Sequence, residues 1–371
     1  MVASVGRRTR AAIVEQNDRA LRAAVVDMAF ETGWDSVTFT GVAKRAGLTV
    51  GAVYGRAEST AELGIELWES VVRDWLAGVM AELLAAGEAG DRRAMSSALE
   101  RWHREERMTA VAVELVIASL FDPDLDEVIG VDMRKYLTAA CTPGGQPRVS
   151  AQLAAARALV LSFGFGRAIA LRGGARLSPL TTAQLRSVAG LCVAPQLRRV
   201  SPQGPALDWV RPMEDLDSTT RAILRATVEV VGRIGYRRAT IARIARAAGV
   251  PRGSVMAHFA TKADLVGEAA RRALIPPGEV WEQYSDVVSK RGPLEARAIF
   301  LTDFFKPVNR SLWAVNLELA RVGRFIPEVG EFRANPNVLE HTHLGVMLVA
   351  SFVPGLDKLN YLGPFQAGSA T

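Results

Sequence analysis

Residues 222–265 read AILRATVEVVGRIGYRRATIARIARAAGVPRGSVMAHFATKADL. Apolar residues recur there at the three- and four-residue spacing of amphipathic helices, and Gly235 and Gly249 interrupt the pattern. Gly249 separates two short helical stretches at a point where a tight turn needs a positive φ, which glycine adopts without strain. The stretch therefore predicts a helix-turn-helix, with Thr240 capping its first short helix and Thr261 capping the helix that follows.

Residues 20–63 form a second copy of this stretch, and a shift of 202 positions aligns the two copies without a gap. We call residues 20–63 the first repeat and residues 222–265 the second repeat. The matches cluster at glycines, small residues and apolar positions, where backbone geometry is constrained, so we interpret the copies as one duplicated unit. The identities are Ala20/Ala222, Ala24/Ala226, Val26/Val228, Gly33/Gly235, Thr38/Thr240, Ala43/Ala245, Ala46/Ala248, Gly47/Gly249, Gly51/Gly253, Val53/Val255, Ala61/Ala263 and Leu63/Leu265.

Each repeat predicts four helices in the same order. In the first repeat, Asn17 or Asp18 is available to cap the first helix, and a glycine C-cap at Gly33 ends it. The second helix follows Thr38, and Gly47 forms the turn. The third helices, at residues 49–56 and 251–258, are the ones expected to lie in the major groove of DNA.

The similarity continues faintly beyond the repeats. At an offset of 204 positions the matches are Glu114/Glu318, Leu115/Leu319, Phe121/Phe325 and Pro123/Pro327, and at an offset of 189 they are Ser162/Ser351, Phe163/Phe352 and Gly166/Gly355. The change of offset indicates that the second half lost about fifteen residues, opposite the loop at 141–149.

The remaining segments are helical in pattern and show no alternating strand signal, so the sequence predicts an all-α protein. We expect a first helix-turn-helix domain at 10–64, a first helical regulatory domain at 65–199, a linker at 200–215, a second helix-turn-helix domain at 216–266 and a second, shorter regulatory domain at 267–371. The small residues of 153–171 permit close packing, and we expect 153–171 and 181–197 to contact 341–356 across the two halves.

Composition excludes several classes of protein. The 371 residues are 49% hydrophobic and 23% charged, as in a soluble globular protein. The apolar stretches at 108–121 and 344–356 are shorter than the roughly 20 residues of a membrane helix, and residues 1–10 lack a signal-peptide core. Cys141 and Cys192 suggest neither a disulfide framework nor a metal site. We expect a cytoplasmic protein with no membrane partner.

The positive charge of the chain is concentrated in the second repeat. Residues 217–265 contain nine basic and three acidic residues, a surplus equal to the net charge of +6 of the whole chain. A basic surplus on one small segment is typical of a surface that binds nucleic-acid phosphates.

The second repeat resembles the DNA-binding motif of the TetR family. The resemblance covers residues 235–241 (GYRRATI), 244–250 (IARAAGV), 253–255 (GSV), 258–259 (HF) and 261–265 (TKADL); the first repeat resembles the motif less strongly. Family members usually carry one such domain on about 200 residues and act as homodimers. Each half of this chain is near that size, so the resemblance implies a covalent pseudo-dimer that binds an operator in double-stranded DNA.

The resemblance, together with the helical pattern, assigns DNA contacts to two sets of side chains. They are Thr38, Lys44, Thr49, Val50, Ala52, Tyr54 and Arg56 in the first repeat, and Thr240, Arg243, Arg252, Ser254, Met256, His258 and Lys262 in the second. Neither copy is complete. In the family a tyrosine late in the third helix and a lysine that starts the fourth commonly contact phosphates, but here Thr60 replaces the lysine and Met256 replaces the tyrosine. Plainer interpretations stay open: packing for Tyr54, and solvated surface cations for Arg252 and Lys262.

The resemblance also implies a small-molecule effector, and aromatic residues of the helical domains are candidates to line its pocket. These are Trp102, Phe121, Phe304, Trp313 and Phe325, although ordinary core packing explains such residues equally well. His341 and His343 point to different faces of a helix and have no third ligand nearby, so no metal site and no cofactor are expected.

The sequence thus predicts a DNA-binding regulator, a ligand-responsive repressor on an asymmetric operator. No catalytic pattern stands out, so an enzyme is not expected. The alternative is a protein-interaction or ligand-sensing module that keeps the fold with weak or no specific DNA binding. Contact between the two halves is expected, and higher oligomers stay open.

Overall fold

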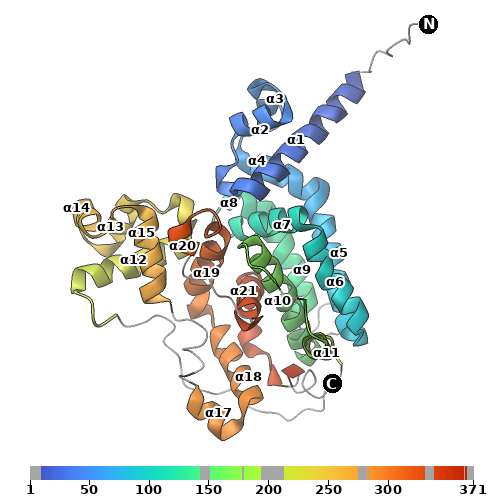
Figure 1. Cartoon of the computed structure of the whole chain (residues 1–371), viewed down its shortest axis with the longest axis vertical. Helices are drawn as coiled ribbons and strands as arrows, with labels where there is room; N and C mark the ends of the chain where they lie inside the picture. Colours follow the sequence, from blue (N-terminus) through green and yellow to red (C-terminus); the bar gives the residue numbers. More distant parts are fainter. Residues whose placement is uncertain are drawn as a thin grey trace.

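A computed structural model describes residues 10–142, 151–177, 179–193, 213–274, 282, 284–330, 338–362 and 364–365. These residues form helices joined by turns and contain no β-strand, which confirms the all-α prediction. Two groups of helices project from a helical body in different directions (Figure 1). We call α1–α4 the first unit and α12–α15 the second unit. Most of the expected linker, residues 200–212, lies outside the described residues.

The first unit contains α1 (Arg10–Thr32), α2 (Phe39–Ala46), α3 (Val50–Tyr54) and α4 (Thr60–Leu67). The Thr38 hydroxyl accepts a hydrogen bond from Gly41 N and caps α2, while Gly47 has φ 67° and ψ 29°, the left-handed conformation expected for the turn. The start of α1 was predicted wrongly. The helix begins at Arg10, so Asn17 and Asp18 lie inside it.

The second unit repeats this arrangement with α12 (Ser218–Arg238), α13 (Ile241–Ala248), α14 (Arg252–His258) and α15 (Lys262–Ala273). Thr240 caps α13, Gly249 is left-handed, and Thr261 forms a capping box with Asp264 at the start of α15. These capping and turn predictions are therefore confirmed. Helices α4 and α15 run across the expected domain boundaries near residues 64 and 266.

Gly33 and Gly235 bend the chain between the first two helices of each unit. Their dihedral angles are φ 83° and ψ 156° at Gly33, and φ 75° and ψ 162° at Gly235. Both glycines therefore have positive φ with an extended ψ, rather than the left-handed helical conformation of a C-cap glycine. The predicted helix end at residue 33 is right, but its geometry is a sharper bend.

The body consists of the remaining helices. In the first half they are α5 (Arg73–Ala89), α6 (Arg92–Arg104), α7 (Glu106–Ala118), α8 (Pro123–Leu125), α9 (Val131–Cys141), α10 (Ala151–Arg172) and α11 (Thr182–Gly190). In the second half they are α17 (Ser285–Arg291), α18 (Pro293–Phe304), α19 (Arg310–Val322), α20 (Pro327–Gly330) and α21 (Val338–Phe352). Helix α1 packs on α7, and α12 packs on α19, so each unit rests on a helix of its own half.

Helices α10 and α21 form the most extensive helix pair in the described part of the chain. They cross closely because Gly345 has no side chain: a β-carbon there would lie 1.7 Å from the carbonyl oxygen of Ser162 and 2.6 Å from Gly166 N. Segment 153–171 therefore packs against 341–356, as expected from its small residues. Helix α11 instead packs on α5, α6 and α10 of its own half, and residues 194–197 of the expected contact segment lie outside the described residues.

Helix α10 is also long and apolar enough, by length and composition alone, to cross a membrane. This stretch is not among those considered above from the sequence, at 108–121 and 344–356. In the structure, 83% of its most apolar stretch is buried inside the protein, so it serves as a core helix of the body.

Candidate nucleic-acid interface

Helices α3 and α14 present their predicted contact residues to solvent. Tyr54 is 60% exposed, Met256 43% and Val50 37%. Each helix is anchored by a fully buried valine on its opposite face, Val53 in α3 and Val255 in α14. The two helices thus offer an outward face carrying apolar and aromatic groups at equivalent places in the two units.

The other residues predicted for this interface are also exposed or half-buried. Exposed positions are Thr38, Lys44, Thr49, Arg56, Thr240, Arg243, Arg252 and His258, and half-buried ones are Ala52, Ser254 and Lys262. The structure therefore brings the set for each repeat onto one unit, around α3 in the first and around α14 in the second.

Several of these side chains already have partners within the chain. Arg56 donates from Nε to Asp18 Oδ1 at 2.6 Å and from Nη1 to the carbonyl of Ala52 at 2.8 Å. Tyr54 packs edge-on against Phe39, with ring centroids 4.6 Å apart. The ring of Tyr54 therefore packs on its neighbour, while most of the residue stays exposed and its contact with phosphate stays a prediction.

Lys262 is held more firmly than the sequence suggested. Its Nζ donates to the carbonyl of Tyr236 at 3.0 Å and lies 3.9 Å from the centroid of the Tyr236 ring. Burial lowers the pKa of this lysine. The cation at the start of α15 therefore has an intramolecular role, which a phosphate contact would have to share.

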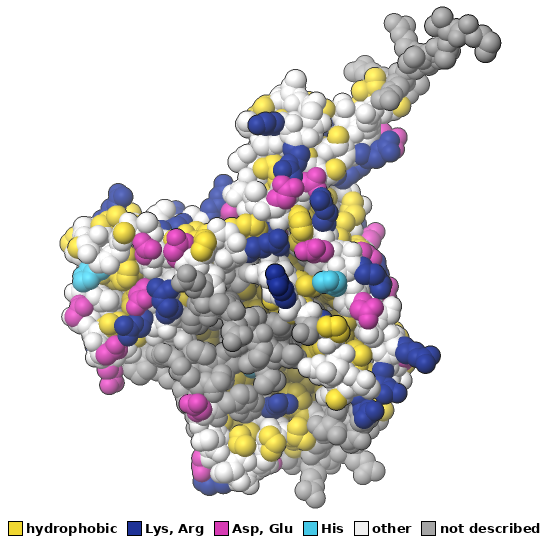
Figure 2. Space-filling model, viewed as in Figure 1, with side chains coloured by type: hydrophobic (Ala, Val, Ile, Leu, Met, Phe, Trp, Pro, Cys, Tyr) yellow, Lys and Arg dark blue, Asp and Glu magenta, His cyan; other side chains and the backbone are white. Residues whose placement is uncertain are grey.

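The charges of the second unit are mixed on the face that Figure 2 shows. Acidic side chains lie there among the basic ones, rather than on a separate face. On this face the basic side chains therefore form no continuous patch, and the surplus of residues 217–265 acts as a general attraction for anions.

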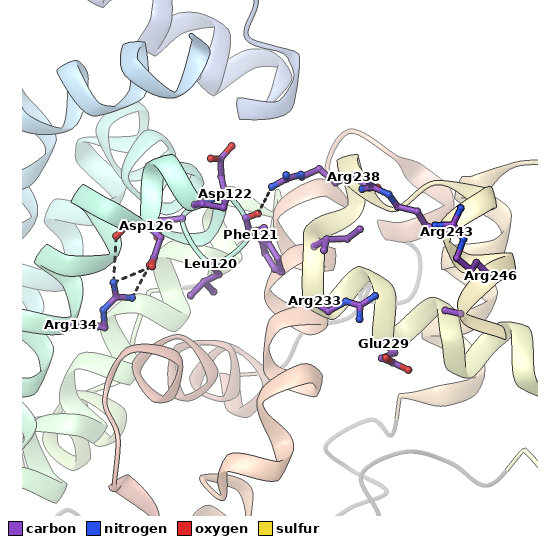
Figure 3. Close-up of a pocket in the computed structure, with 14 residues that line it drawn as sticks. Leu120, Phe121, Asp122, Asp126, Arg134, Glu229, Arg233, Arg238, Arg243 and Arg246 are labelled. Atoms are coloured by element: carbon purple, nitrogen blue, oxygen red, sulfur yellow. Dashed lines mark hydrogen bonds and ion pairs between the residues drawn. The ribbon is translucent and has the colours of Figure 1, made fainter. Parts of the chain in front are cut away.

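A cleft of about 970 Å³ lies between the second unit and the first half. Figure 3 shows its two walls: Arg233 and Glu229 come from α12, Arg243 and Arg246 from α13, and the facing wall carries Asp122 and Asp126. Arg134 pairs with Asp126 at 2.7 Å within the facing wall, and Arg238 donates to the carbonyl of Phe121 at 3.1 Å, which links the two walls. No sequence pattern predicts this cleft, because the cleft forms only where the two halves pack together.

The five aromatic residues predicted to line a ligand pocket do not meet at one site. Trp102 is buried between Trp75 and Phe165, while Trp313 donates from Nε1 to the carbonyl of Phe304 in a separate cluster of the second half. Phe121 and Phe325 lie against the glycine bends of the two units. Of the five, Phe121 alone lines the cleft. In the described residues no group of three metal-ligating side chains comes together; the His341 side chain lies outside that part.

Buried charges hold the first unit on the body, and the sequence analysis missed their role. Arg172, at the end of α10, donates to the carbonyls of Ala29 and Phe30 at 2.7 Å and 2.8 Å, which caps the end of α1. Its Nε donates to Glu114 Oε1 at 2.7 Å, and both side chains are fully buried. One signal was available in the sequence, since Glu114 interrupts an apolar stretch.

Residues 223–269, which include α13, α14 and most of α15, match the family model described as bacterial regulatory proteins, tetR family. The second unit resembles the TetR family. Among solved structures, one described as a transcriptional regulator of Streptomyces coelicolor A3(2) aligns with 47% of this chain and 96% of its own, at 19% identity and a TM-score of 0.30. That score is too low to carry an argument. A search of curated proteins found no match.

Proposed function

We propose that the chain is a DNA-binding transcriptional regulator, a repressor that uses both units on one operator as a covalent pseudo-dimer. The observation that carries the proposal is the TetR-type match of residues 223–269 on a unit whose third helix, α14, is exposed. The first unit supports it because α3 occupies the same place after the same capped helix and left-handed glycine. The close packing of α10 on α21 supplies the contact between halves that a homodimer would form between chains.

Native mass spectrometry of the protein bound to a minimal operator, selected from genomic DNA fragments, tests this proposal. We expect one chain per duplex. Two chains per minimal site would contradict the pseudo-dimer. Absence of salt-dependent binding, even to random duplex, would favour the protein-interaction or ligand-sensing alternative, since phosphate contacts release counterions and weaken as salt rises.

The effector of such a regulator is, in our proposal, a small anion that binds the cleft between the second unit and the first half. In the described part of the chain, neither Arg233 nor Arg246 has a hydrogen bond or ion pair, and guanidinium groups suit carboxylates and phosphates. The volume of the cleft lies within the range of small-molecule sites. Such an anion would bind the wall that carries the arginines, while Asp122 on the facing wall would repel it. Binding would therefore favour one placement of the second unit and thereby change DNA affinity.

Thermal unfolding with citrate and with pyrophosphate as probes tests the cleft. We expect a melting temperature that rises with probe concentration, and loss of this rise in the double variant Arg233→Ala/Arg246→Ala. Arg310→Ala, an exposed change outside the cleft, is the matched control. An equal rise in all three proteins would contradict the cleft as the site. If the double variant lost affinity for random duplex instead, these arginines would belong to the DNA interface.

A further inference from the structure

The guanidinium of Arg321, on α19, is the centre of a hydrogen-bonded chain between the two units. Its Nε donates to Glu318 Oε2 at 2.8 Å. Its terminal nitrogens donate to Glu114 Oε2 at 3.0 Å and to Asp35 Oδ2 at 2.9 Å. Asp35 belongs to the first unit, in the turn between α1 and α2, whereas Glu114 and Glu318 belong to the helices on which the two units rest.

Both ends of the chain reach the glycine bend of a unit. Glu114 Oε2 accepts from Trp34 N at 2.9 Å, and Glu318 Oε1 accepts from Tyr236 N at 2.6 Å. Trp34 and Tyr236 directly follow the glycine bends and correspond at the offset of 202, while Glu114 and Glu318 correspond at the offset of 204. The same contact therefore occurs in each half, and Arg321 joins the two copies.

The side chains of this hydrogen-bonded group are buried, which restricts their movement. Arg321 is 3% exposed, Glu318 1% and Glu114 0%. Burial alone would lower the pKa of Arg321, but the carboxylates of Glu318 and Glu114 raise it well above its usual value. A displacement of the first unit would break the bonds of Asp35 and Trp34 N, and a displacement of the second would break the bond of Tyr236 N. Each loss would leave polar or charged groups short of a partner at a largely buried site, so such displacements are disfavoured.

Arg321 has no counterpart in the first half, where the offset of 204 aligns it with the buried Ile117. In a two-fold symmetric homodimer every residue off the axis occurs twice, so a single guanidinium could not serve both halves. A duplicated and fused chain has no such restriction. One arginine can then bind both corresponding carboxylates, of which Glu114 also pairs with Arg172, and so connect the contacts of the two units.

We propose that Arg321 is the positioning residue that fixes the two units relative to each other, and that it thereby sets the spacing between half-sites that the protein accepts. The hydrogen bonds of Arg321 described above support its role in positioning the units. The spacing part rests on the proposed function, because half-sites exist only if both units bind DNA. Lysine at this position keeps the charge but lacks the planar fork that reaches three carboxylates at once.

A distance measurement without DNA tests the positioning part. Spin labels are placed at Tyr54→Cys and Met256→Cys, both exposed, in protein carrying Cys141→Ala and Cys192→Ser. We expect a narrow distance distribution in this parent and in Arg310→Lys, an exposed change on the same helix, and a broader or shifted one in Arg321→Lys. Asp35→Ala, at a part-exposed position, removes one hydrogen bond and should produce a smaller change of the same kind. Unchanged distributions in both variants, with cooperative unfolding preserved, would overturn the proposal.

Operators with one or two base pairs inserted between the half-sites test the spacing part. We expect the parent to lose about tenfold or more in affinity for each insertion, and Arg321→Lys to lose clearly less. Equal losses in both proteins would overturn the role in spacing. If the parent bound no DNA, the proposed function would fail, while the spin-label distances would still decide whether Arg321 positions the units.

Discussion

Phe121 of the first half lies directly against Gly235 of the second, 3.1 Å from the position that a β-carbon on Gly235 would occupy. The relationship is reciprocal. Phe325, which corresponds to Phe121 at the offset of 204, lies 2.9 Å from a β-carbon position on Gly33. Each unit therefore bends around an aromatic ring supplied by the other half, as expected for an interface related by a two-fold axis. The glycines serve both the bend and the close approach of the ring.

This contact predicts that Gly235→Ala destabilises the protein more than Gly292→Ala does. Gly292, with φ 82° and ψ 164°, has almost the backbone of Gly235, but a β-carbon there would meet nothing within 4 Å. In both variants the strain of that backbone destabilises the protein by about 1–3 kcal/mol. In Gly235→Ala, overpacking against Phe121 and the carboxylate of Glu318 lowers the free energy of unfolding by about 1–3 kcal/mol more. Urea unfolding of the two variants measures the difference, and equal losses would show that Phe121 yields freely.

A second stability prediction concerns the crossing of α10 and α21. Gly345→Ala forces a β-carbon into backbone atoms of Ser162, so we expect a loss of about 3 kcal/mol or more in the free energy of unfolding. Because the clash is with backbone, Ser162→Gly should not restore stability. Gly51→Ala, where a β-carbon meets nothing within 4 Å, is the control and should be neutral or stabilising, since alanine favours helices. A stable Gly345→Ala protein would mean that the two halves can separate at this crossing.

Local features could be predicted from the sequence, whereas contacts between distant segments could not. Thr38, Gly47 and their counterparts act within a few residues, so residue type and spacing suffice to place the caps and turns. The hydrogen bonds of Arg321 to Glu114 and Glu318 depend on how α7 packs near α19, and no local sequence pattern predicts that packing. Glu114 and Glu318 did leave a signal, as aligned carboxylates with apolar neighbours. Arg321 left none, because its counterpart is an isoleucine.

Arg252 and Lys262 should affect DNA binding in different ways. If Arg252 reads a guanine, Arg252→Ala costs about 1–3 kcal/mol at the operator and relaxes the base preference at one position. Lys262→Ala should weaken binding to all sequences alike and reduce the salt slope by about one unit. It should also lower the melting temperature, because the carbonyl of Tyr236 loses one of its two donors and its ring loses the cation above it. Binding titrations at several salt concentrations separate these effects. An unchanged salt slope with a lower melting temperature would confine Lys262 to its intramolecular role.

The operator should be asymmetric, because the outward faces of α3 and α14 differ. Val50 and Ala52 offer apolar contact, which suits a thymine methyl group, whereas Arg252 suits guanine. One half-site should therefore be rich in A·T pairs, and the other should require a G·C pair.

The distribution of charge between the two units also predicts an asymmetric operator. The first repeat has four basic and five acidic residues, and the structure pairs Arg56 with Asp18 and Arg45 with Glu31, so little positive charge is left there for phosphates. The second unit should supply most of the phosphate affinity. Footprinting on operators with either half-site scrambled decides between the arrangements. We expect loss of the second unit's half-site to abolish protection, and loss of the other to weaken it only partly. A perfect palindrome with two equally sensitive halves would instead mean that two chains pair and bind through the same repeat.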